Sequence, residues 1–102
     1  MSCDDFKLSY QTLTPGQTCP EHTIIQNGRV LRKRESGRSL FFLDLGCERG
    51  ETLQVKCASS EFETEDLYDL ARSVTRGDQI SVQGFPGCTA KGQLLLCARD
   101  MQ

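Results

Sequence analysis

The chain has 102 residues, with 12 lysines and arginines against 14 aspartates and glutamates, for a formal net charge of −2. This length suits one domain, and 37% hydrophobic with 25% charged residues excludes a disordered polyelectrolyte. No apolar run approaches the roughly 20 residues that span a bilayer, and the N-terminus has no signal-peptide pattern, so we expect a cytoplasmic protein without membrane contact. The one histidine, His22, limits acid–base chemistry near neutral pH, which favours a binding module.

The first residues differ in pattern from the rest of the chain. Thr14-Pro15-Gly16 is a turn signal, and Pro20 comes directly before the first strand-like run. We therefore expect a lead-in segment over residues 1–21 and a single domain over residues 22–102.

Three strands are predicted in the first half of this domain. The first covers residues 22–31 and continues into the basic stretch 32–34, after which residues 35–38 form a turn. The second covers residues 39–45 and the third residues 51–57, with a glycine-bounded turn over 46–50 between them. The third strand alternates cleanly between apolar and polar residues, as a strand with one buried face does.

The period then changes to that of an amphipathic helix. Thr64 is a plausible N-cap, and Gly77 is predicted to end the helix. Apolar residues at the spacing i, i+3, i+4 and i+7 form the predicted buried stripe. They are Leu67, Leu70, Ala71 and Val74.

Two further strands complete the domain. Residues 78–83 form the fourth, which the segment 84–87 is predicted to end, and residues 93–98 form the fifth, after the Lys91-Gly92 turn. The order is three strands, one helix and two strands. This is the layout of an all-β fold with one helix between strands three and four, the five-stranded Greek-key OB-fold barrel.

Six cysteines in a short chain can indicate a disulfide framework. Here there is no CxxC pair, no signal peptide, and no cysteine pair at zinc-ligand spacing. We therefore expect free thiols in a reducing compartment and no metal site. The cysteines are Cys3, Cys19, Cys47, Cys57, Cys88 and Cys97.

The net charge conceals an asymmetry between two parts of the chain. Acidic residues gather around the helix, whereas five basic residues fall within ten positions of the first hairpin. Such a local basic run attracts phosphates even in a slightly acidic domain, although charge runs are also common on ordinary solvated faces. The basic residues are Arg29, Arg32, Lys33, Arg34 and Arg38.

The alternation of the second and third strands brings a few chemically useful side chains to one face. Phe42 and Gln54 fall opposite the apolar sets of their strands, so both point outward if the hairpin pairs in register. An outward aromatic beside an amide and an arginine can stack on a base, bond its edge and hold a phosphate. The alternative is that Phe42 packs into a second small core under a loop. No catalytic constellation is present, so no catalytic residue is assigned.

A series of short motifs in one order makes the sequence recognisable. Together they resemble the N-terminal anticodon-binding OB domain of eukaryotic-type class II lysyl-tRNA synthetases, over roughly residues 6–100. The motifs are Leu13-Thr14-Pro15-Gly16, Gly28-Arg29-Val30, Arg34-Glu35-Ser36-Gly37, Leu40-Phe41-Phe42-Leu43-Asp44-Leu45, Leu53-Gln54-Val55, Arg76-Gly77-Asp78, Gly84-Phe85-Pro86-Gly87 and Lys91-Gly92.

The resemblance implies a domain that binds the anticodon stem-loop of tRNA-Lys and reads its uridines. Phe42 would stack on the central anticodon uridine, Gln54 would bond its edge, and Arg34 would contact the same nucleotide. Where the family has a glutamate that helps to read the first anticodon base, this chain has Gln93. The basic hairpin adds Arg32 and Lys33 as expected phosphate contacts.

The resemblance also implies a parent enzyme, an ATP-dependent lysine–tRNA ligase of protein biosynthesis. ATP, Mg²⁺ and any homodimer contact would belong to its catalytic domain, and for the 102 residues themselves we expect no cofactor and leave enzymatic activity open. Two other functions remain compatible with the same face. One is general single-stranded nucleic-acid binding, and the other is a protein-interaction OB domain with Phe42 as an apolar anchor.

Overall fold

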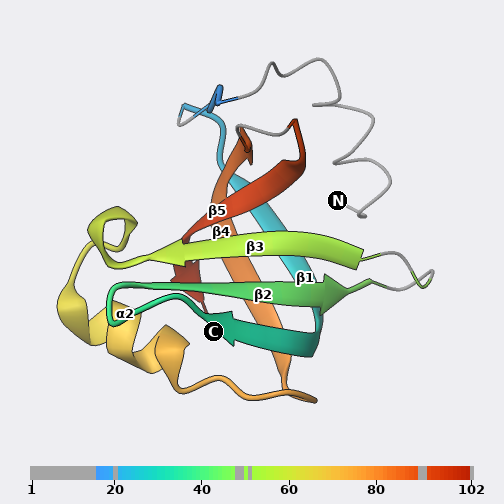
Figure 1. The fold of residues 1–102 in the computed structure, drawn as a ribbon, viewed down its shortest axis with the longest axis vertical. Helices are drawn as coiled ribbons and strands as arrows, with labels where there is room; N and C mark the ends of the chain where they lie inside the picture. Colours follow the sequence, from blue (N-terminus) through green and yellow to red (C-terminus); the bar gives the residue numbers. More distant parts are fainter. Residues whose placement is uncertain (1–15, 20, 48–49, 51, 90–91, 102) are drawn as a thin grey trace.

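The computed structural model describes residues 16–19, 21–47, 50, 52–89 and 92–101. Within this part of the chain five strands form a closed barrel with the order β1-β2-β3-β5-β4 (Figure 1). A short 3₁₀ helix, η1 (Ser59–Glu61), and the helix α2 (Glu65–Arg72) lie between β3 and β4. The predicted OB-fold barrel with its helix between strands three and four is thus confirmed. The strands are β1 (Ile24–Glu35), β2 (Leu40–Gly46), β3 (Thr52–Ala58), β4 (Gln79–Cys88) and β5 (Leu94–Met101).

The long strand β1 closes the barrel because it pairs with two neighbours. Its first half is antiparallel to β4 and its second half is antiparallel to β2. Between Val30, opposite Leu45, and Arg32, opposite Asp44, the register shifts by one residue, so that Leu31 is extra. A bulge of this kind bends the strand and reverses the alternation of its faces.

The core lies inside the barrel and follows the predicted alternation of β2 and β3. Phe41, Leu43 and Leu45 of β2 point inward and are fully buried, and so are their counterparts on β3. The helix α2 packs against β3 and β5 and adds Tyr68 to this core. The ring of Tyr68 lies 5.7 Å from that of Phe41, and its hydroxyl donates to the Arg38 carbonyl at 3.2 Å.

The helix starts where the sequence predicts and ends earlier. Thr64 is the N-cap, and its hydroxyl accepts from the Leu67 N–H at 3.2 Å. The helix stops at Arg72, however, so the predicted stop at Gly77 is wrong. The segment after the helix is held against β1 instead, because the Gly77 N–H donates to the Val30 carbonyl at 2.7 Å.

The predicted buried stripe is also only partly correct. Leu70 is 60% exposed, whereas Tyr68, which lies outside the stripe, is buried. The reason is the short helix: with Val74 beyond its end, the stripe lacks its last turn, and the aromatic cluster of Phe41, Phe62 and Tyr68 sets which face turns inward.

Strand β4 continues through the segment 84–87 that was predicted to end it. Gly84 permits this, because a Cβ at that position would lie 2.0 Å from the Cys97 carbonyl oxygen of β5. Past this close approach, Phe85 forms a small second cluster with Leu95 and Cys97. Residues 16–19 run beside this end of β4, where Thr18 pairs with Gly87.

The cysteines only partly match the expectation of free thiols. Cys19, Cys57, Cys88 and Cys97 are free. Cys47 is disulfide-bonded, so the prediction is wrong at this position. The spacing of cysteines along the chain could not reveal this, because a disulfide depends on the distance between two residues in the fold.

None of the helices among the described residues is long and apolar enough to cross a membrane.

The close approach at Gly84 predicts a severe effect of adding one methyl group. Gly84→Ala should lower the free energy of unfolding by about 3 kcal/mol or prevent folding, because the contact is with backbone that cannot move aside alone. Ser81→Ala, on the same strand, should change it by less than about 0.5 kcal/mol. Urea unfolding followed by circular dichroism measures both, and equal stability of the two variants would contradict the close approach.

Candidate functional site

The outer face of β1, β2 and β3 carries a row of three side chains from neighbouring strands. Arg34 of β1 lies opposite Phe42 of β2, which in turn lies opposite Lys56 of β3. The guanidinium carbon of Arg34 is 5.6 Å from the centre of the Phe42 ring, within cation–π distance. Phe42 is half-buried and belongs to neither cluster of core residues. Its ring is therefore available from one side as an apolar platform.

A second row runs parallel to the first and lies two residues away from it on each strand. It consists of Arg32, Asp44 and Gln54, so Gln54 lies diagonally across from Phe42 on the same face. The Gln54 side-chain oxygen is buried and has no hydrogen-bond partner among the described residues. An acceptor left in this state is favourable for a ligand that brings a donor. The structure thus brings Arg32, Arg34, Phe42 and Gln54 to one face. The strand pattern predicted this for Phe42 and Gln54, whereas the bulge in β1 places the two arginines there.

A hollow of about 350 Å³ borders this face, between β2 and β3 on one side and the β4–β5 end of the barrel on the other. Its volume is at the lower end of the range of about 300–1,000 Å³ that is usual for small-ligand pockets. Its walls are largely apolar. The lining residues are Gly16, Thr18, Phe42, Lys56, Gly87, Cys88, Thr89, Leu95 and Cys97.

Lys33, the other basic candidate of this hairpin, does not lie on the outer face. It follows the bulge by two residues and points to the helix side, where its ammonium group donates to the Arg72 carbonyl at the C-terminal end of α2. The same group lies 3.6 Å from a Glu35 carboxylate oxygen and 5.4 Å from the Phe41 ring centre. Its side chain is 19% exposed. A cation at this position stabilises the negative end of the helix dipole.

Gln93 stands in the loop between β4 and β5, just before β5 begins. Its backbone N–H donates to the Thr89 hydroxyl at 3.0 Å, and its carbonyl accepts from the Thr89 N–H at 2.8 Å. Gln93 is exposed, and Thr89, to which its backbone is hydrogen-bonded, lines the hollow.

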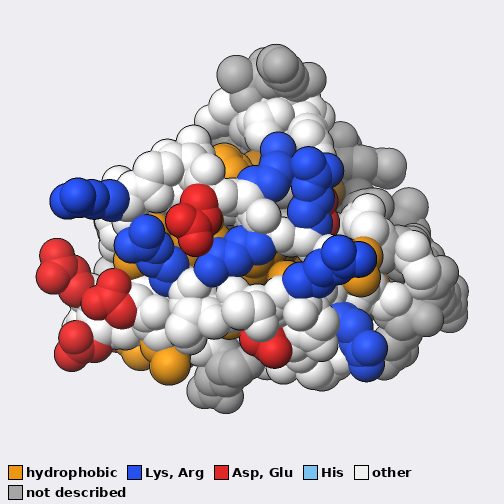
Figure 2. Space-filling model, turned by 60° about the horizontal axis from the view of Figure 1, so that its bottom comes forward, with side chains coloured by type: hydrophobic (Ala, Val, Ile, Leu, Met, Phe, Trp, Pro, Cys, Tyr) orange, Lys and Arg blue, Asp and Glu red, His pale blue; other side chains and the backbone are white. Residues whose placement is uncertain are grey.

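Charge is unevenly distributed over the surface. Blue Lys and Arg side chains spread in a band across the face seen in Figure 2, whereas several red Asp and Glu side chains group at the left edge and others lie singly within or below the band. Arg29, Arg32 and Arg34 of β1 are all exposed, and so are the acidic residues Glu65 and Asp66 of α2. The outer face therefore offers positive charge to an anion although the chain is slightly negative overall.

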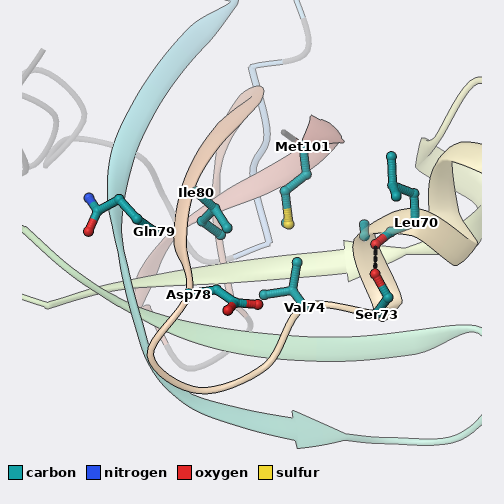
Figure 3. Close-up of a pocket in the computed structure, with 8 residues that line it drawn as sticks. Leu70, Ser73, Val74, Asp78, Gln79, Ile80 and Met101 are labelled. Carbon is teal, nitrogen blue, oxygen red and sulfur yellow. Dashed lines mark hydrogen bonds between the residues drawn. The ribbon is translucent and has the colours of Figure 1, made fainter.

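A second hollow, of about 290 Å³, lies between the end of α2, the start of β4 and Met101 (Figure 3). Leu70, Val74 and Ile80 make it largely apolar, and its lining, within the part of the chain that the structure describes, includes no lysine or arginine. The hollow beside Phe42 is therefore the better candidate for an anionic ligand.

The wall that Cys97 contributes is uncharged at neutral pH. Burial raises the pKa of the Cys97 thiol to about 11, against smaller opposing effects of Lys56 and Arg99 and a small further increase from Glu61. Burial likewise raises the pKa of Cys57, inside the barrel, to about 12.

Several residues of this hollow were not among the sequence candidates. Lys56 shares the outward set of β3 with Gln54, so the alternation of that strand contained the signal for it. Thr18, Thr89 and Cys97 carried no such signal, because the barrel closure brings them to β2 and β3 from distant parts of the chain.

Comparison with known proteins places the chain beside lysine–tRNA ligases. It is 35% identical over 88 residues to the lysine–tRNA ligase cla4 of Cladosporium cladosporioides, an alignment that covers 84% of this chain and 14% of that protein. It is 34% identical over 91 residues to the lysine–tRNA ligase of Deinococcus radiodurans, with 89% and 16% covered. The chain thus spans about one-seventh of the length of these relatives. No protein-family model matches it.

The raised pKa of Cys97 predicts low reactivity towards iodoacetamide, because the thiolate is the reactive form. At pH 7 the native protein should be alkylated at the half-buried Cys19 before Cys97 or Cys57, and the rate at Cys97 should increase as the pH rises towards about 11. Peptide mass spectrometry measures the modification at each site, with the urea-unfolded protein as a control in which the three react alike. Fast, pH-independent alkylation of Cys97 would contradict its burial.

Proposed function

Because this chain is related over 84–89% of its length to a segment of lysine–tRNA ligases, we propose that it binds the anticodon stem-loop of tRNA-Lys and reads its uridines. The observation that carries the proposal is the shared outer face of Arg34, Phe42 and Gln54, beside a hollow of suitable size. Single-stranded bases are commonly recognised on the outer face of an OB barrel by this combination of stacking and hydrogen bonding.

Each of these side chains has a chemical part in the proposal. Phe42 stacks on the central anticodon uridine, and Arg34, already beside the ring, contacts the same nucleotide. The Gln54 side-chain oxygen, which has no partner among the described residues, accepts the hydrogen bond of the uridine N3–H. The N3–H of a uridine thus gives this acceptor a hydrogen-bond partner.

Phosphate contacts come from the exposed arginines of β1. Arg32 lies on the outer face in the row next to Phe42, and it has no ion-pair partner among the described residues. Lys33 was expected to share this part, but its ammonium group is already committed to Glu35 and to the end of α2. We therefore assign the phosphate contact of this pair to Arg32.

Gln93 takes the first anticodon base in the proposal, from the loop where its backbone is hydrogen-bonded to Thr89, a residue of the hollow. An amide can present either its oxygen or its NH₂ group, whereas the glutamate of the resembled family only accepts. Discrimination at this base is therefore looser here than a carboxylate would make it.

The ligation of lysine to tRNA belongs, in this proposal, to a longer protein. The chain corresponds to 14–16% of its relatives, and the ATP, Mg²⁺ and homodimer contacts that the resemblance implies lie in the catalytic domain. Its place would then be the cytoplasm, where tRNA is charged.

General single-strand binding is the second candidate function, because every nucleic-acid base can stack on the ring of Phe42. Binding of the tRNA-Lys anticodon stem-loop, measured against a stem-loop of the same length with another anticodon at two salt concentrations, separates the two. Preference for the tRNA-Lys loop supports anticodon reading, and equal binding favours the general binder.

Replacing the stacking ring should weaken binding while leaving the fold intact. Phe42→Ala is expected to cost about 1–3 kcal/mol of binding free energy, most for a loop with uridine at its centre. Phe42→Leu keeps apolar bulk without the ring and should bind as weakly, whereas Phe42→Tyr should retain binding. Fluorescence anisotropy gives the affinities, and thermal unfolding checks the fold. Unchanged binding by the folded leucine variant would remove Phe42 from the site.

Neighbouring basic residues should differ in their effect on salt dependence. Arg32→Met should weaken binding to all tRNA loops alike and reduce the slope of log K against log salt by about 0.7 to 1, as one phosphate contact is lost. Lys33→Met removes the same charge from the helix side, so it should lower stability and leave the slope of the folded protein nearly unchanged. If Lys33→Met reduces the slope and Arg32→Met leaves it unchanged, Lys33 rather than Arg32 makes the phosphate contact.

A further inference from the structure

Of the described residues that line the hollow beside Phe42, Lys56 alone carries a positive charge. Lys56 occupies the position of β3 directly opposite Phe42, so the two side chains are nearest neighbours on the outer face. It also lies opposite Cys97 of β5 in the parallel ladder, at the junction between β3 and the wall formed by the other end of the barrel. The ammonium group is therefore carried by a rigid strand at the edge of the stacking platform.

Unlike Lys33, Lys56 has no charged or hydrogen-bonding partner for its ammonium group among the described residues. No ion pair or hydrogen bond involves its side chain among the described residues, whereas Lys33 contacts both Glu35 and the Arg72 carbonyl. The side chain is half-buried, and its positive charge lies close enough to Cys97 to oppose in part the rise that burial causes in the pKa of that thiol. A half-buried ammonium group in an apolar hollow is stabilised by any oxygen acceptor that enters.

We propose that Lys56 is a further contact residue, which donates a hydrogen bond to an oxygen of the nucleotide stacked on Phe42. The inference rests on the proposed function, because it needs a nucleotide in the hollow. The oxygen is either a base carbonyl or a backbone phosphate, since both accept from an ammonium group.

The hydrogen-bonding chemistry of lysine predicts which base the contact favours. An ammonium group has three donors and no acceptor, so it pairs with a base oxygen but not with an amino group at the same position. Uracil carries carbonyl oxygens on both sides of N3, whereas cytosine replaces one of them with an amino group. A Lys56 directed at the C4 position of the base therefore favours uridine over cytidine, and it complements the acceptor that Gln54 offers to N3–H.

The test compares Lys56→Met, which keeps the length of the side chain without its charge, with Lys56→Arg, which keeps the charge. Arg76→Met is a matched control, because Arg76 is exposed in the turn before β4 and lines neither the hollow nor the outer face. Affinities are measured by fluorescence anisotropy for hairpins that carry uridine or cytidine at the centre of the loop, at two salt concentrations. Thermal unfolding confirms that each variant is folded.

Lys56→Met is expected to weaken binding of the uridine hairpin by about tenfold to a hundredfold, with most of the affinity restored in Lys56→Arg and little change in Arg76→Met. Loss of the preference for uridine over cytidine identifies a base carbonyl as the acceptor. An equal loss for both hairpins, with a shallower salt slope, identifies a phosphate. Both results support the contact.

Binding by Lys56→Met at the level of Arg76→Met would overturn the inference. Phe42→Leu, measured beside it, separates this failure from failure of the proposed function. If Phe42→Leu binds weakly while Lys56→Met binds normally, the hollow holds a nucleotide that Lys56 does not contact. If neither substitution affects binding, the outer face is not the nucleic-acid site, and both proposals are wrong.

Discussion

The extra residue at Leu31 determines which way the basic hairpin faces. Before it, the even-numbered residues of β1 point inward, as the buried Val30 does; without the bulge Arg32 and Arg34 would enter the core. The inserted residue reverses this alternation and places both arginines outside, opposite Asp44 and Phe42. Leu31 itself lies over the backbone of Gly46, where a Cβ would be 2.9 Å from its side chain. The outer face of the candidate site therefore depends on one local irregularity.

Barrel closure supplies the other half of the site. At Gly84 the backbones of β4 and β5 come so close that no side chain fits between them, and beyond this point Phe85, Leu95 and Cys97 pack as a second cluster outside the main core. Leu95 and Cys97 form a wall of the hollow that begins at Phe42. A binding surface mounted on closed, hydrogen-bonded strands loses little freedom on binding, and this favours affinity.

Electrostatics and shape act on different steps of the proposed recognition. The chain is slightly negative, yet its acidic residues gather at α2 and its exposed arginines line β1, so an approaching phosphate backbone meets a positive face. Lys33 has a different part. It joins β1 to the end of α2, where its positive charge meets the helix carbonyls. Two adjacent basic residues thus serve binding and folding separately, because the strand alternation sends them to opposite sides.

The sequence alone determined the fold class, the order of the elements, the inward faces of β2 and β3, and the sharing of one outer face by Phe42 and Gln54. These follow from local periodicity, because apolar residues that recur every two residues indicate a strand and those that recur every 3.6 residues indicate a helix. Only the tertiary structure decided the early end of α2, the continuation of β4 through Gly84, the separation of Lys33 from Arg32, and the hollow that Lys56 lines. Each of these depends on a strand register or on a close backbone approach between distant segments. Such contacts produce no periodic pattern in the sequence, so the sequence alone does not predict them.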